Sequence, residues 1–349
     1  MSRARRTRWA GGSWRQVPSC TPVIPGGLSW SATCCRSHCT TAPSKQDPAP
    51  PFPSRLHGLR RHGFPIGVLF RPYSLRNKER HPMTITDALA ARAFLLRATE
   101  PPAPAVSAFV VAHGPVEAVE RIRSGAAPQA VLQEICNRQP RIVEDLAAID
   151  AGRFRLLTPD DPDWPHGGFH SLSEHGLGAP LGLWVRGNAG LAESTCAAVS
   201  VVGSRAATGY GEHVAKTLGM DLSRSGVTVL ASGAYGIDGH AHCGALLGPT
   251  PPIAVLACGV DVAYPQGHAR LLDSVAHNGL LISEYPFGTR PTRPRFAARG
   301  RLLAALGVAT VVVEAGLRSG AVAVAYTAAA LGVASTAFPA RSPPPHRPA

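Results

Sequence analysis

Short apolar runs rich in β-branched residues alternate with helical patterns from residue 196 onward, and this alternation restricts the fold more than any other feature of the chain. Unbroken apolar runs of this length are typical of strands buried on both faces of a parallel sheet. The helical patterns between them provide the crossovers that parallel strands require. We therefore predict an α/β fold with a doubly wound, Rossmann-like parallel sheet over 196–340. Its strand candidates are AAVSVVG, VTVLAS, PIAVLACG, LLISEYP, ATVVVEAG and ASTAFP.

A different pattern precedes this region. Between 83 and 150 the chain is rich in alanine, and apolar positions recur at intervals of three and four, which indicates a small helical domain. Breaks such as EPPAPA and HGP divide it into separate helices. The segment 151–195 is loop-rich, with turn signals such as TPDDPDWP, and we expect it to lead into the sheet.

The charge of the chain is unevenly distributed. Residues 1–82 contain 14 Lys/Arg and 2 Asp/Glu, whereas residues 83–349 contain 21 and 20. Because 1–82 also lacks a helical or strand period, we predict that it is a disordered extension and that translation starts at Met83. The proline-rich tail 341–349, RSPPPHRPA, is predicted to be disordered as well. The net charge of +13 therefore says little about the folded part.

The cysteines and the length of the apolar runs indicate the cellular compartment of the protein. Cys136, Cys196, Cys243 and Cys258 are scattered among apolar neighbours, and we expect them to be reduced core residues of a cytoplasmic protein. No apolar run reaches the roughly 18 to 20 residues that a bilayer span needs. An organelle transit peptide at the Arg-rich start is the alternative. We expect a soluble cytoplasmic protein that makes no membrane contact.

Polar groups follow the first predicted strand directly. Gly203, Ser204 and Arg205 bring backbone N–H groups, a hydroxyl and a guanidinium to the start of a helix, an arrangement suited to an anion. The glycine spacing fits neither a dinucleotide fingerprint nor a P-loop. The alternative is a tight turn with a solvated arginine.

The second strand is followed by the stretch SGAYGIDGHAH, which contains Ser232 and Gly233. Asp238 is placed to cap the next helix through its side chain. His240 and His242 are two residues apart and point in different directions on a helix, so a metal site is disfavoured. We expect no metal and no cofactor.

The later strands also end in polar residues. Carboxyl ends of parallel strands meet at one edge of a sheet, where ligands bind such folds. Each group could instead serve only its own turn. We expect the pocket at this edge to be lined by Asp238, His242, Gly259, Tyr264, Ser283, Glu284, Glu314, Ser319 and Gly320.

One basic cluster stands out in the nearly neutral part of the chain. RPTRPRFAARGR contains five arginines and no acidic residue. Such a cluster can neutralise a phosphate backbone, and the alternative is a solvated loop in an Arg-rich protein. The arginines concerned are Arg290, Arg293, Arg295, Arg299 and Arg301.

Taken in order, these motifs resemble the DNA-processing protein A family, DprA/Smf. The resemblance covers about 84–339. It is carried by GSR (203–205), SGAYGIDGHAHCGAL (232–246), GVDVAYP (259–265), LISEYP (281–286), F…RGRLLAAL (296–306) and VVVEAGLRSGA (313–321).

The resemblance implies a sterile-alpha-motif-like helical domain before an extended Rossmann fold that binds single-stranded DNA. It also implies a homodimer that protects incoming strands in natural transformation and loads the RecA recombinase, without being an enzyme. Matching positions place Gly203, Ser204, Arg205, Ser232, Gly233, Arg299 and Arg301 around a phosphate-accepting pocket. We expect Arg205 and the arginines of 290–301 to neutralise phosphates.

The chain departs from the family pattern at several points. Gly300 stands in RGR where the family has asparagine, VAVAY follows SGA, and PA replaces PG at 339–340. We expect a divergent or truncated member, for which the dimer is in doubt, or a non-functional copy. The enzymatic alternative is a nucleotide phosphoribohydrolase with a similar fold, but its PGGxGTxxE loop is missing here.

Overall fold

The computed structural model describes residues 86–338. The predicted disorder of 1–82 and of 341–349 lies outside the described residues. The expectation that four cysteines lie in the core is wrong for three of them, because Cys136, Cys196 and Cys243 are exposed and Cys258 is buried. None of the helices within 86–338 combines the length and the apolar character needed to cross a membrane.

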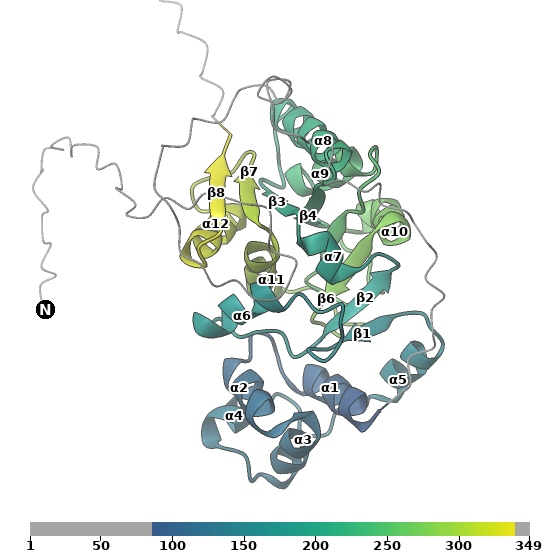
Figure 1. Cartoon of the computed structure of the whole chain (residues 1–349), viewed down its shortest axis with the longest axis vertical. Coiled ribbons are helices and arrows are strands. Elements are labelled where there is room, and N and C mark those ends of the chain that lie inside the picture. Colours follow the sequence, from purple (N-terminus) through teal and green to yellow (C-terminus); the bar gives the residue numbers. More distant parts are fainter. Residues whose placement is uncertain (1–85, 339–349) are drawn as a thin grey trace, which may run out of the picture. The chain divides into compact units, whose positions relative to one another are not determined.

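The first part of the described chain is helical, as predicted (Figure 1). Helix α1 begins after Thr86, whose side chain accepts a hydrogen bond from the Leu89 N–H at 3.2 Å. Its large apolar residues are almost fully buried, Phe94 among them, and they share one core with Ile122. The helices are α1 (Asp87–Ala98), α2 (Pro104–His113), α3 (Pro115–Ser124), α4 (Gln129–Gln133) and α5 (Val143–Asp150).

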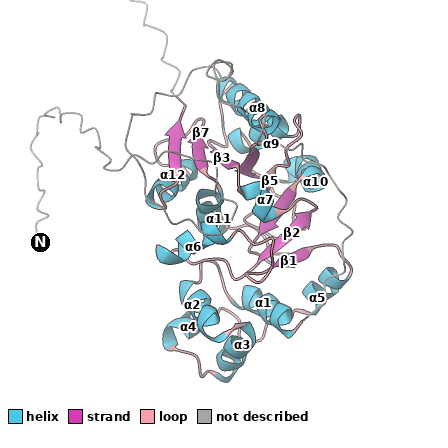
Figure 2. Ribbon diagram, viewed as in Figure 1, coloured by secondary structure: helices cyan, strands magenta, loops and turns pink. Residues whose placement is uncertain are grey.

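A single eight-stranded sheet follows in the order β1-β2-β6-β5-β4-β3-β7-β8. Figure 2 shows strands in magenta and helices in cyan. Strands β3 to β8 are parallel, and each corresponds to one of the predicted apolar runs. The predicted class, an α/β fold with a doubly wound Rossmann-like sheet, is confirmed. The strands are β1 (Arg155–Leu157), β2 (Leu183–Gly187), β3 (Ala198–Val202), β4 (Thr228–Ser232), β5 (Ile253–Val255), β6 (Leu280–Ser283), β7 (Ala309–Val312) and β8 (Ala334–Ala337).

The strand order reverses at β3. Strand β3 pairs with β4 on one side and with β7 on the other, both in parallel. The loops that leave β3 and β7 therefore start from neighbouring strands, but they lead into helices on opposite faces of the sheet. This topological switch point is where open α/β sheets leave a crevice for ligands.

Strands β1 and β2 were not predicted from the sequence. Both lie in the segment 151–195, which we expected to be a loop-rich lead-in, together with α6 (His166–Glu174) and α7 (Leu191–Thr195). Strand β2 pairs antiparallel with β6, and β1 pairs antiparallel with β2 at the edge of the sheet.

Helices cover both faces of the sheet. Helices α8 (Gly209–Arg224) and α9 (Ile237–Ala245) pack over Val201 and Val229 on one face, whereas α11 (Arg293–Leu306) and α12 (Gly320–Ala330) pack over Val202 and Leu230 on the other. Gly244 lets α8 and α9 approach closely, because a Cβ there would lie 1.9 Å from the Lys216 carbonyl oxygen. A 3₁₀ turn, η3 (Gln266–His268), precedes α10 (Ala269–Asn278).

Candidate functional site

A groove of about 1140 Å³ opens at the switch point. Its walls come from the residues after β3 and β4, from α11, and from the start of α12. Many residues predicted for the site line it: Gly203, Ser204, Arg205, Ser232, Asp238, Tyr264, Arg293, Arg299, Arg301, Ser319 and Gly320. A smaller adjoining pocket of about 60 Å³ is lined by Gly233. The topology thus brings together residues that are far apart in the sequence.

Two arginines lie close to the same aromatic ring in this groove. The guanidinium carbon of Arg205 lies 4.6 Å from the centre of the Phe296 ring, and that of Arg299 lies 5.7 Å from it. Arg205 follows β3, whereas Phe296 and Arg299 lie on α11. Within residues 86–338, Arg205 is exposed and has no ion-pair or hydrogen-bond partner for its guanidinium. A cation on a ring face is held in place while its N–H groups stay free for a ligand.

Arg299 is more deeply placed than Arg205. Burial lowers its pKa, the charge of Asp238 opposes this shift, and the charge of Arg205 adds to it. The Nε–H of Arg299 is buried and has no hydrogen-bond partner in the described part of the chain. A buried donor without an acceptor costs about 1–3 kcal/mol, so it favours binding of an acceptor.

Asp238 joins the ends of two neighbouring strands. Its carboxylate accepts hydrogen bonds from the Ser232 N–H at 3.0 Å, from the Ser232 hydroxyl, and from the Gly203 N–H at 3.3 Å. Burial raises its pKa, while these hydrogen bonds and the Arg299 charge lower it. The expectation that Asp238 caps the next helix is corrected, because it lies inside the first turn of α9 and its carboxylate is directed to β3 and β4.

The backbone N–H groups after β3 are not free for an anion, contrary to our expectation for the GSR motif. The Gly203 N–H donates to Asp238, and the Ser204 N–H donates to the Glu314 carbonyl oxygen at 2.6 Å. The Ser204 hydroxyl donates to the Ala206 carbonyl oxygen at 3.0 Å. Arg205 is therefore the group of this motif that remains available.

Glu314 supports the start of α8 instead of lining the groove. Its carboxylate accepts the Thr208 N–H at 3.1 Å and the Thr208 hydroxyl at 2.9 Å. Thr208 in turn caps α8 by accepting from the Gly211 N–H at 3.2 Å. A carboxylate at this position complements the helix dipole. The anion site that the sequence indicated at this helix start is thus filled by the protein's own glutamate.

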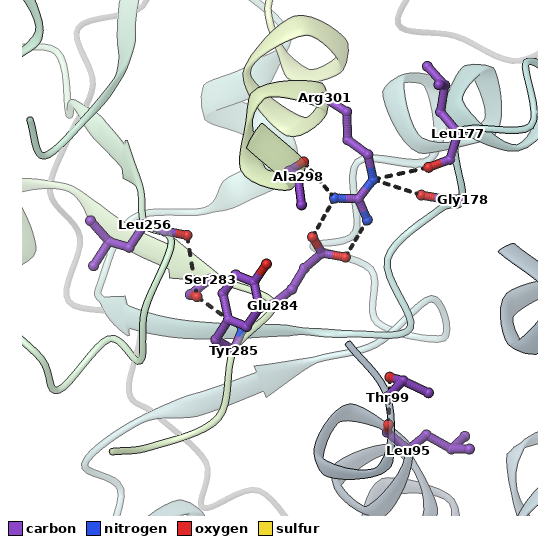
Figure 3. A network of polar contacts seen from close by, with 10 residues as sticks. All are labelled: Leu95, Thr99, Leu177, Gly178, Leu256, Ser283, Glu284, Tyr285, Ala298 and Arg301. Carbon is purple, nitrogen blue, oxygen red and sulfur yellow. Dashed lines mark hydrogen bonds and ion pairs between the residues drawn. The ribbon is translucent and has the colours of Figure 1, made fainter. Parts of the chain in front are cut away.

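Arg301 is committed to a buried ion pair (Figure 3). Its two terminal nitrogens donate to the two Glu284 carboxylate oxygens at 2.6 Å each. The Nε–H donates to the Leu177 and Gly178 carbonyl oxygens, both at 3.1 Å. The side chains are only 7% and 3% exposed. Arg301 and Glu284 therefore hold α11 to β6, and we no longer assign Arg301 to phosphate or Glu284 to the pocket.

The remaining arginines of the cluster differ in whether their guanidinium groups are free to bind a phosphate. The segment is not a solvated loop, because α11 begins at Arg293. Arg295 pairs with Glu100 through two hydrogen bonds of 2.6 and 2.7 Å, which neutralises its charge. Arg290 and Arg293 are exposed, and only Arg293 lines the groove. Acidic partners from distant segments are invisible in the local sequence RPTRPRFAARGR.

Three other predicted pocket residues lie away from the groove. His242 is fully buried within α9, and burial lowers its pKa to about 4. Backbone groups of Ala231 and Ser232 lie near its ring, but neither ring nitrogen has a partner with hydrogen-bond geometry in the described chain. The Ser283 hydroxyl donates to the Cys258 carbonyl oxygen at 2.7 Å. The Gly259 N–H donates to the Thr289 carbonyl oxygen at 3.0 Å.

Two aromatic residues of the site were not predicted. Phe296 lies close to both Arg205 and Arg299, and the only sequence signal is its position inside the arginine cluster. Tyr235 lines the smaller pocket and is 47% exposed. Aromatic residues interleaved with arginines are a recognised pattern of single-strand binding surfaces, and this pattern could have indicated Phe296.

Comparison with known proteins gives a consistent result. The family profile described as DNA recombination-mediator protein A matches residues 155–346. A Mycobacterium tuberculosis protein described as DNA processing protein DprA is 46% identical over 257 residues, which are 71% of this chain and 66% of that protein. Protein Smf of Synechocystis is 38% identical over 169 residues, 48% of this chain and 41% of that protein. This chain thus spans slightly less than two thirds of its mycobacterial relative.

The fold is also similar to a solved structure. The X-ray structure of DNA processing protein A from Streptococcus pneumoniae superposes with a TM-score of 0.60 and 26% identity. The superposition covers 74% of this chain and 89% of that one. The profile match, the related sequences and the shared fold lead to one conclusion: the chain belongs to the DNA recombination-mediator protein A family, DprA/Smf.

Proposed function

We propose that this protein binds single-stranded DNA in the groove at the switch point of its sheet. The observation that carries the proposal is the presence of two guanidinium groups, those of Arg205 and Arg299, close to the Phe296 ring. Guanidinium groups bind phosphate oxygens through paired, charge-assisted hydrogen bonds. We assign phosphate contacts to Arg205 and Arg293, which line the groove, are exposed and have no acidic partner among the described residues.

Aromatic rings favour a single strand over a duplex. The Phe296 and Tyr264 rings lie 5.6 Å apart between their centres, and Tyr264 is 41% exposed. Bases stack on such rings only when their faces are free, as they are in unpaired strands. A duplex presents phosphates to arginines but hides the faces of its bases. The combination of free guanidiniums with rings therefore supports single-stranded DNA as the ligand.

The finer proposal follows family membership. We infer that the protein is a cytoplasmic mediator of DNA recombination rather than an enzyme. In this role it protects incoming single strands during natural transformation, forms a homodimer and loads RecA onto the bound strand. Because the chain spans less than two thirds of its mycobacterial relative, each of these activities needs a direct test on this chain.

The enzymatic alternative is not supported by the site. A phosphoribohydrolase of this fold would need a strand-end glutamate facing the ligand. Glu314 instead accepts hydrogen bonds from Thr208 at the start of α8. Incubation with nucleoside monophosphates should release no free base, and base release that Glu314→Gln abolishes would favour the hydrolase.

The proposed function is tested by fluorescence anisotropy with a labelled 30-nucleotide single strand and with the corresponding duplex. We expect tighter binding of the single strand, with affinity that falls linearly on a logarithmic salt scale. Equal or tighter binding of the duplex, or no binding of either, would contradict the proposal.

A further inference from the structure

One arginine of α11 is held by an acidic residue from the helical part of the chain. The Nε–H of Arg295 donates to one carboxylate oxygen of Glu100 at 2.6 Å, and a terminal nitrogen donates to the other at 2.7 Å. The second terminal nitrogen donates to the Arg290 carbonyl oxygen at 2.6 Å. Arg295 therefore does not line the groove, in contrast to the other arginines of α11: Arg293, Arg299 and Arg301.

Glu100 lies in a segment that forms part of the groove wall. This segment joins α1 to α2, and Pro102, two residues after Glu100, lines the groove. The Thr99 hydroxyl ties the start of the segment to the Leu95 carbonyl oxygen at 2.8 Å (Figure 3). A Cβ on Gly178 would lie 3.4 Å from the Pro102 side chain, so the segment is packed closely. The fold thus fixes the backbone that presents the carboxylate.

The pair of Arg295 and Glu100 is accessible to a competing anion. The side chain of Arg295 is 21% exposed and that of Glu100 is 41% exposed, whereas both members of the Arg301–Glu284 pair are buried. An ion pair at the surface adds little net stability, because water solvates the separated charges. The guanidinium of Arg295 also lies 5.0 Å from the centre of the Tyr285 ring, a contact that does not need Glu100. An anion can therefore replace Glu100 at little cost to the fold.

We propose that Glu100 occupies a phosphate-binding position at Arg295 and that a phosphate of the bound strand displaces it. The inference rests on the proposed function and adds how the site limits its own affinity. A phosphate offers a guanidinium two oxygens in the same paired arrangement that a carboxylate offers. Asp238 is the only acidic residue that lines the groove in the described part of the chain, and it is 5% exposed. A strand that enters beside Pro102 meets Glu100 as an accessible carboxylate.

The displacement has a consequence for the dependence on salt. Arg295 exchanges one anion for another, and the freed carboxylate of Glu100 attracts a cation from solution. The exchange therefore releases no net counterion, and Arg295 adds little to the affinity or to its salt dependence in the wild type. Without the carboxylate, the same contact would release one counterion. The pair thus keeps binding weak enough for release of the strand, which suits the proposed role as a mediator.

The test measures the affinity of the full chain for labelled oligo-dT by anisotropy at several salt concentrations. Glu100→Gln should bind about fivefold more tightly than the wild type, because Arg295 becomes free for a phosphate. The slope of log K against log salt should become steeper by about 0.7. Glu100→Ala, which leaves no acceptor for Arg295, should give the same gain.

Two further variants separate this effect from a change in net charge. Glu117→Gln removes the same charge from α3, where Glu117 is 48% exposed and pairs with Arg121 at 2.5 Å away from the groove lining. Its affinity should remain close to that of the wild type. In the double variant Glu100→Gln with Arg295→Ala the gain should disappear, because the two residues act on the same contact.

Several outcomes would overturn the displacement and leave the proposed function intact, since the wild type would still bind. These are unchanged or weaker binding by both Glu100 variants, a gain that persists without Arg295, and an equal gain in Glu117→Gln. Absence of oligo-dT binding by the wild type and by all variants would overturn both proposals.

Discussion

Arg205 and Phe296 belong to different crossovers of the sheet, yet the guanidinium carbon of Arg205 lies 4.6 Å from the centre of the Phe296 ring. Arg205 follows β3, which pairs with both β4 and β7, and Phe296 lies on α11, which leads into β7. The reversal of strand order at β3 is what brings the two together. The contact restricts the arginine before any ligand arrives and so reduces the entropy lost on binding.

The buried pair of Arg301 and Glu284 leads to a prediction about stability. Arg301→Ala should lower the free energy of unfolding by about 3–5 kcal/mol, because it leaves Glu284 buried without its partner. Urea denaturation followed by circular dichroism measures this. The matched control is Arg295→Ala, because the partner of Arg295, Glu100, is 41% exposed. This variant should lower the free energy of unfolding by at most about 1 kcal/mol. Equal losses in the two variants would show that Arg301 is not a structural residue.

The carboxylate of Glu314 leads to a prediction that separates fold from ligand binding. Glu314→Ala removes the acceptor for the Thr208 N–H and hydroxyl at the start of α8. We expect a loss of about 1 kcal/mol in stability, the usual effect of a missing helix cap. Affinity for single-stranded DNA, measured on the folded variant, should equal that of the wild type. A selective loss of DNA affinity would place Glu314 in the site after all.

His242 leads to a prediction about pH. Its pKa is about 4 in the folded protein against 6.5 for the free side chain, because burial disfavours the charged ring. Below pH 6.5 the unfolded chain therefore binds a proton that the folded chain does not bind. This difference destabilises the fold as the pH falls, and the loss from pH 7 to pH 5 is about 2 kcal/mol.

The variant His242→Leu checks this prediction. It removes the titrating ring, so the loss of stability between pH 7 and pH 5 should be smaller by about that amount, whatever its stability at pH 7. Buried carboxyl groups with raised pKa values, such as that of Asp238, stabilise the folded state as the pH falls. The substitution leaves this contribution unchanged. The same pH dependence in both proteins would show that His242 does not titrate as described.

The sequence alone predicted the strands that position the groove and many of the residues that line it. Continuous apolar runs predicted β4, β5 and β6 because a strand buried on both faces must be apolar throughout. Strand β8 was also predicted, although all four of its residues are exposed. The glycines after β3 and β4 marked the close approach of two turns: a Cβ on Gly236 would lie 2.2 Å from the Ser204 carbonyl oxygen. Strands β1 and β2 were missed because their pairing depends on β6, far along the chain.

The sequence could not assign the arginines of α11, because their local motif contains no acidic residue. Their partners are set by tertiary structure: Arg301 meets Glu284 of the β6 end, and Arg295 meets Glu100 of the segment after α1. The same reason explains why GSR looked like an anion site. Its backbone N–H groups are used by Asp238 and by the Glu314 carbonyl oxygen, neither of which is close in sequence.

The proposed function depends most on Arg205, which we expect to neutralise a phosphate of a bound single strand. Its most direct test is the salt dependence of oligo-dT affinity for Arg205→Ala, with Arg224→Ala at the far end of α8 as a control for the loss of one exposed positive charge. We expect Arg205→Ala to weaken binding about tenfold. The slope of log K against log salt should become shallower by about 0.7, one phosphate contact on a single strand. Arg224→Ala should have the affinity and the slope of the wild type. An unchanged affinity and slope for Arg205→Ala would contradict a phosphate contact of Arg205.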